Sequence, residues 1–103
     1  MLYVLLARIT DEGLRRFHAN PDLFASACRR VKVDGARLLS RYATLGEYDF
    51  VAMAEADDAE SMARLSVALG AEGYVHIESM QAVSAHLMAE PTGVVFINEI
   101  NAA

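Results

Sequence analysis

A few polar side chains lie beside apolar stretches of this 103-residue sequence, where they could carry acid–base chemistry. Gly46 interrupts the regular pattern of the sequence, and Asp49 follows it and leads into the apolar run Phe50–Ala54. One interpretation is a general base or hydrogen-bond anchor in an apolar pocket. The other, which we favour, is that the carboxylate accepts backbone N–H groups of the turn at 45–47 and holds that turn in shape.

Two tyrosines, two histidines and one glutamate extend this candidate set. Tyr42 and Tyr48 flank the same turn, and each could pack its ring or donate its hydroxyl to a ligand. His76 and Glu78 share one face of a predicted strand, where they could transfer a proton or simply face solvent. His18 precedes a break in its helix and could line the lip of a pocket. The candidate catalytic residues are therefore Asp49, His76 and Glu78, and the candidate ligand-binding residues are Tyr42, Tyr48 and His18.

No metal or cofactor site is predicted. His76 and Glu78 are too few to bind a metal, and no cluster of histidines and cysteines completes them. The single cysteine, Cys28, shares an apolar stripe with Phe24 and Val31, which favours a small core residue over a nucleophile. The sequence contains neither a Gly-rich phosphate loop nor a nucleophile elbow.

The composition limits the class of protein. The length fits one domain, and the net charge of −5 argues against a general nucleic-acid binder. One cysteine suits a reducing compartment. The apolar start, MLYVLLARIT, is too short to span a bilayer and lacks the basic region of a signal peptide. We therefore expect a soluble, cytoplasmic protein with no membrane or nucleic-acid partner.

Hydrophobic periodicity and chain breakers predict the secondary structure. The expected strands cover residues 2–9, 37–44, 48–55 and 74–83, and the expected helices cover residues 11–18, 21–33 and 58–70. A short helix at 84–90 and a fifth strand at 93–100 would follow. Arg37 and Arg41 are expected on one face of the second strand, where such charges protect a sheet edge.

This order, β-α-β-β-α-β, is typical of a ferredoxin-like α+β sandwich with an antiparallel sheet. Its first and third strands lie in the centre, and its helices cover one face. Both of these strands are apolar on both faces here, so a second face would be exposed, which soluble monomers avoid. We therefore predict a homodimer packed sheet to sheet. Residues 86–103 form an extension whose strand would lie at the dimer boundary.

The stretch Gly46–Asp49 (GEYD) resembles the signature of the GYD-domain family. The flanks ITDEG, NPD, YATLGEYDFVAMAEADD and GYVHIESM follow the family's order and spacing, so the resemblance covers about residues 2–83. It implies a GYD-like domain at 1–85 with the dimeric α/β-barrel fold. Related barrels include cofactor-free monooxygenases, isomerases, polyketide cyclases and regulatory ligand-binding modules, and the fold does not choose among them.

Two functions follow as hypotheses. The first is a small-molecule-binding protein, whose enzymatic form would be a cofactor-independent monooxygenase, isomerase or cyclase acting on an apolar or aromatic substrate. The second is a non-catalytic module that senses a ligand or binds a partner protein. A closed pocket holding several of the polar candidates would favour the first, towards which the sequence leans, without deciding whether the ligand is turned over.

Overall fold

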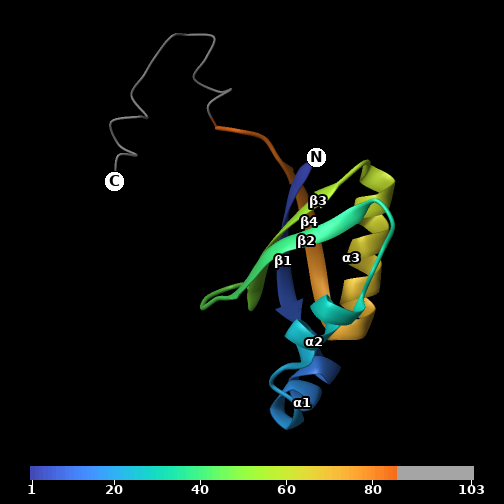
Figure 1. Ribbon diagram of the computed structural model, residues 1–103. Helices are drawn as coiled ribbons and strands as arrows, with labels where there is room; N and C mark the ends of the chain where they lie inside the picture. The colour runs from blue at the N-terminus through green and yellow to red at the C-terminus, as the bar shows by residue number, and fades with distance from the viewer. Residues whose placement is uncertain (86–103) are drawn as a thin grey trace.

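A computed structural model describes residues 1–85, which form a four-stranded sheet and three helices (Figure 1). In chain order the elements are β1 (Leu2–Ile9), α1 (Asp11–Ala19), α2 (Leu23–Arg30), β2 (Ala36–Ala43), β3 (Phe50–Ala56), α3 (Ala59–Gly73) and β4 (Val75–Ala82). The predicted fifth strand and nearly all of the predicted helix at 84–90 lie outside the described residues. None of the helices at 1–85 is long and apolar enough to cross a membrane.

The strands pair in the order β2-β3-β1-β4, and every pairing is antiparallel. β1 and β3 are therefore central, as their two-sided apolar character predicts. In Figure 1, α3 runs along one face of the sheet, with α2 beside it at the lower end and α1 beyond the end of the sheet. This arrangement confirms the predicted ferredoxin-like α+β fold.

The core lies between the sheet and the helices. Alternate residues of β1 point towards the helices, and Leu5 at the centre is 1% exposed. α3 contributes Leu65 and Leu69 to this core, while Phe24 of α2 stacks on Phe50 with 4.4 Å between the ring centroids. Packing of these apolar side chains fixes which face of the sheet the helices cover.

The opposite, open face of the sheet carries the other alternate residues. It presents Leu2, Val4, Leu6, Val51, Met53 and Met80, which the strand pairings place side by side. Leu2 is 39% exposed and Met80 46% exposed. The apolar second face that the sequence predicts is thus present.

A β-bulge in β2 corrects one prediction. The register slips between Leu38 and Ser40, so Arg37 lies opposite Glu55 and Arg41 lies opposite Ala52. Because one extra residue reverses the alternation of side chains, Arg37 is on the open face and Arg41 is on the helix side. The expectation that both arginines share a face is therefore wrong.

Helix ends also differ from the prediction. α3 begins after a cap formed by Asp58, whose carboxylate accepts from the Ser61 N–H at 2.8 Å, so the helix starts at Ala59 rather than at the predicted residue 58. It continues to Gly73 and ends at Tyr74, a non-glycine residue with φ of 55°. Local sequence signals locate the end of a helix only to within about two residues.

Candidate functional site

The connection between β2 and β3, residues 44–49, is here called the Gly46 loop. Its backbone closes through the Thr44 N–H, which donates to the Asp49 carbonyl at 2.9 Å. The Thr44 hydroxyl donates to the Tyr48 carbonyl at 2.7 Å. Gly46 has φ of 117°, as its place in a tight connection predicts. The loop is thus held by its own first and last residues.

Asp49 fastens this loop to the end of β1. Its carboxylate accepts from the Ile9 N–H at 2.8 Å, and its own N–H donates to the Ala7 carbonyl at 2.8 Å. The side chain therefore serves as an acceptor for a backbone group of the neighbouring strand. The prediction that this carboxylate accepts the N–H groups of the turn at 45–47 is wrong, because its partner, Ile9, lies 40 residues away in the chain. The role of Asp49 as a general base stays a prediction.

Tyr48 and Glu78 meet on the open side of the sheet. The Tyr48 hydroxyl donates to Glu78 Oε1 at 2.9 Å. The Arg8 guanidinium lies 4.6 Å from the centre of the Tyr48 ring and forms an ion pair with Glu47 at 2.6 Å. The hydrogen bond to Glu78 raises the pKa of Tyr48, and burial adds to this effect. Tyr48 is therefore a neutral hydrogen-bond donor at pH 7 rather than a phenolate base.

His76 completes a small cluster with these groups. It lies opposite Arg8 in the pairing of β1 with β4, and Glu78 follows on the same face. Tyr48, His76 and Glu78 line a shallow cavity of about 100 Å³ together with Arg8. The structure thus brings three predicted residues together and adds Arg8. Nothing in the sequence around Arg8 marks it, because its neighbours come from other strands. The cavity is smaller than the 300–1,000 Å³ usual for small-molecule pockets.

The remaining candidates lie elsewhere. Tyr42 is exposed and lines a different cavity of about 170 Å³, next to Phe24 and Phe50. His18 is exposed on α1 and lines neither cavity. Cys28 is buried, and burial raises the pKa of its thiol, an effect that Arg41 partly opposes. Within residues 1–85 no three histidine, cysteine or acidic side chains are grouped as a metal site would require.

Comparison with known families decides the relationship. The family model of the GYD domain matches residues 3–91. This chain belongs to the GYD-domain family. Its signature residues, Gly46–Asp49, are therefore those of the loop that is fastened to β1, and the resemblance seen in the sequence is confirmed.

A curated relative from Thermus thermophilus, named "Glutamine synthetase and cystathionine beta-lyase binding protein", is 33% identical over 82 residues. The match covers 79% of this chain and 86% of the relative.

Two solved regulatory proteins share the fold. The leucine response regulatory protein of Mycobacterium tuberculosis superposes with a TM-score of 0.60 at 15% identity, covering 81% of this chain and 50% of that one. A regulator of Neisseria meningitidis in complex with L-Met gives 0.60 at 19% identity, covering 81% of this chain and 49% of that one. This chain therefore spans about half the length of those regulators, and the likeness is one of fold.

Proposed function

We propose that this chain is a protein-binding module that works as a homodimer and binds a metabolic enzyme. The observation that carries the proposal is the open face of the sheet, where Val4 lies directly opposite Met53 and Leu6 opposite Val51. Two such faces can pack about 10 Å apart with interdigitating side chains. A second copy removes the exposed apolar surface on both chains at once.

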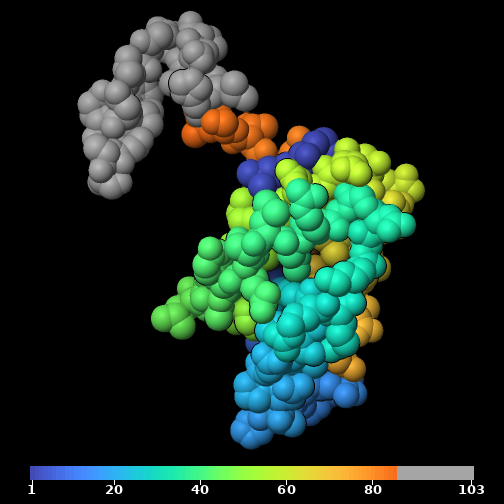
Figure 2. Space-filling model, viewed as in Figure 1, coloured from blue at the N-terminus to red at the C-terminus, as the bar shows by residue number. Residues whose placement is uncertain are grey.

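The Gly46 loop is the surface that we assign to the enzyme. Leu45 is fully exposed, and the hairpin that carries it projects from the body of the molecule (Figure 2). The loop is held by the contacts of Thr44, Asp49 and Tyr48 described above. Because the loop around Leu45 is already held, little backbone entropy is lost when this apolar side chain enters a partner's pocket, so it is suited to anchor a complex.

The choice of an enzyme as the partner rests on the Thermus thermophilus relative and its printed name. Binding rather than turnover is supported by the polar candidates themselves. Tyr48, His76 and Glu78 surround only about 100 Å³, and Asp49 is engaged with β1. A module of this kind needs a well-presented surface more than an enclosed pocket.

A titration tests this function. The chain is titrated with purified glutamine synthetase and cystathionine beta-lyase from its own organism, by light scattering and by calorimetry. We expect saturable binding of at least one enzyme, and Leu45→Asp should weaken it by about tenfold or more because a charge would enter an apolar pocket. Leu14→Asp, at an exposed leucine of α1, is the matched control and should bind like the parent chain. Failure of both enzymes to bind would contradict the proposal.

A second candidate function is binding of a small apolar or aromatic ligand at the Tyr48 cluster. The observation that favours it is the hydrogen-bonded pair of Tyr48 and Glu78 beside His76. Such a ligand could be a substrate for cofactor-independent oxygenation, isomerisation or cyclisation. Melting curves with a set of aromatic compounds test this: a shift that Tyr48→Phe removes would support it, and no shift with any compound would count against it.

We place this function in the cytoplasm. The buried thiol of Cys28 suits a reducing compartment, and metabolic enzymes of the proposed kind work there. The net charge of −5 supports protein rather than nucleic-acid partners.

A further inference from the structure

A groove of about 720 Å³ lies between α1, α2 and the end of α3, and it shares no residue with the Gly46 loop or the apolar open face. Its walls combine three arginines, Arg15, Arg16 and Arg30, with the aromatic ring of Tyr74 and the apolar side chain of Leu23. This volume falls in the 300–1,000 Å³ range of small-molecule sites. None of the candidate site residues predicted from the sequence lines this groove.

The charges around the groove favour an anion. Arg16 pairs with Glu12 at 3.1 Å, and Arg30 pairs with Glu72 at 2.8 Å. No ion pair of Arg15 occurs within residues 1–85. The groove therefore has one more cation than carboxylates, although the chain as a whole carries −5. Because both glutamate pairs are half-exposed, an incoming carboxylate can exchange with them at little cost.

Tyr74 has an unusual backbone that directs its ring to the groove. Its φ of 55° is left-handed, a conformation that non-glycine residues rarely adopt because the Cβ approaches the following carbonyl oxygen. Its carbonyl accepts from the Thr10 N–H at 3.0 Å and the Thr10 hydroxyl at 3.1 Å. Gly13 makes this approach possible, because a Cβ there would lie 2.5 Å from the same carbonyl oxygen. Strain that is held by such contacts is typical of functional positions.

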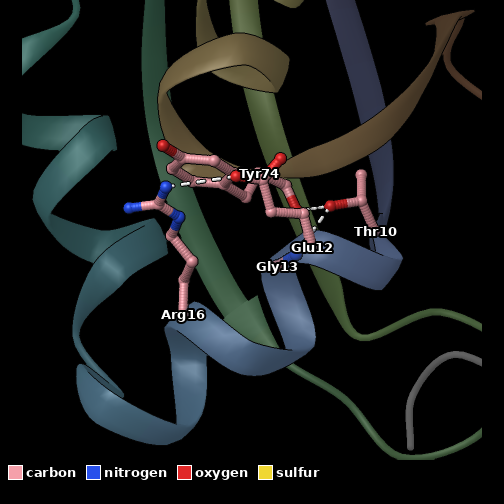
Figure 3. A network of polar contacts seen from close by, with 5 residues as sticks. All are labelled: Thr10, Glu12, Gly13, Arg16 and Tyr74. Carbon is pink, nitrogen blue, oxygen red and sulfur yellow. Dashed lines mark hydrogen bonds and ion pairs between the residues drawn. The ribbon is translucent and has the colours of Figure 1, made fainter.

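Figure 3 shows how the Tyr74 ring lies with respect to Arg16 and Glu12. Arg16 extends from α1 across the ring of Tyr74, with the guanidinium 4.7 Å from the ring centre, and Glu12 lies beside it. The ring thus keeps one guanidinium in place, which lowers the entropy lost when that guanidinium binds an anion.

We propose that this groove binds a small dicarboxylate. One carboxylate pairs with Arg15, and the other takes the place of the Glu12 carboxylate on Arg16 in a bidentate pair. The carbon chain between them lies against Tyr74 and Leu23. A carboxylate fits better than a phosphate because the group it replaces on Arg16 is itself a carboxylate.

The test uses calorimetric titration of the full chain at low salt with succinate and glutarate as probes, and with acetate and inorganic phosphate for comparison. We expect saturable binding of a dicarboxylate, at least tenfold tighter than acetate. Arg15→Gln should weaken it about tenfold, as loss of a charge-assisted contact does. Arg29→Gln is the matched control: Arg29 also lies on the protein surface, pairs with Asp22 at 2.7 Å and does not line the groove, so this variant should bind normally.

Tyr74→Asn separates ligand binding from folding. Asparagine tolerates the left-handed backbone, so the variant should fold and melt close to the parent chain while binding the dicarboxylate several-fold more weakly. The proposal is overturned if no dicarboxylate binds at millimolar concentration, if phosphate binds as tightly with the same dependence on Arg15, or if Arg29→Gln and Arg15→Gln weaken binding equally.

Discussion

Removing the Asp49 carboxylate should loosen the attachment of the Gly46 loop to β1. The loss of stability should depend on which residue replaces it. A hydrogen bond to a charged acceptor contributes about 1.5–3 kcal/mol and one to a neutral acceptor about 0.5–1.5 kcal/mol. In Asp49→Asn the amide oxygen can still accept from the Ile9 N–H, so we expect a loss of about 1 kcal/mol. In Asp49→Ala that N–H loses its acceptor, and we expect about 2 kcal/mol. The half-buried position of Asp49 keeps both values at the lower end of these ranges.

Urea unfolding followed by circular dichroism, at one protein concentration and neutral pH, measures these differences. For a domain of this size, 1 kcal/mol corresponds to a shift of about 4–8 °C in melting temperature, so melting curves provide a second readout. Asp34→Ala is the control, since Asp34 is exposed and surface substitutions usually stay within about 0.5 kcal/mol. If Asp49→Ala is as stable as this control, the contact with Ile9 does not hold the loop.

Three further predictions concern the helices. Gly13→Ala should destabilise the fold in a melting experiment: overpacking against a fixed carbonyl costs about 1–3 kcal/mol, near the upper end at a contact of 2.5 Å, and outweighs the gain of about 1 kcal/mol in helix propensity. Hydrogen bonds from the Ser61 backbone and side chain lower the pKa of Asp58. The stability that Asp58 contributes is therefore present above its pKa in the unfolded chain and is lost as the pH falls through its pKa in the folded protein. The difference in stability between the parent chain and Asp58→Ala, measured by urea unfolding, should shrink below about pH 4. Cys28 should react slowly with iodoacetamide in the folded protein and rapidly in urea, because burial raises its pKa and blocks access.

The sequence predicted the architecture because burial repeats regularly along it. The alternation through Tyr3, Leu5 and Ala7 marks a strand under helices, and the equally apolar residues between them mark a central strand with a second face. Gly46 is a second local signal: glycine adopts a positive φ without steric cost, and its φ of 117° lies in the connection between β2 and β3. Fold class, central strands and family could therefore be inferred from patterns within a few residues of one another.

The contacts that build the site could not be inferred this way. The Asp49 carboxylate meets an N–H 40 residues away, and Arg8 meets Tyr48 only because β1 lies beside β3. The bulge in β2 leaves no clear signal in an ordinary strand sequence, yet it reverses the face of Arg41. The groove depends on the left-handed backbone of Tyr74, for which the preceding glycine offers only a weak hint. In each case long-range packing, rather than local propensity, determines the geometry.

The proposal that two copies pack through the open face of the sheet is tested most directly by the mass of the protein in solution. Multi-angle light scattering at micromolar concentration should give twice the mass of one chain. Val4→Lys, which puts a charge in the middle of that face, should give the mass of one chain, whereas Val67→Lys, at an exposed valine of α3, should leave the dimer intact. A parent chain that stays at the mass of one copy, or a Val4→Lys variant that remains a dimer, would contradict the account.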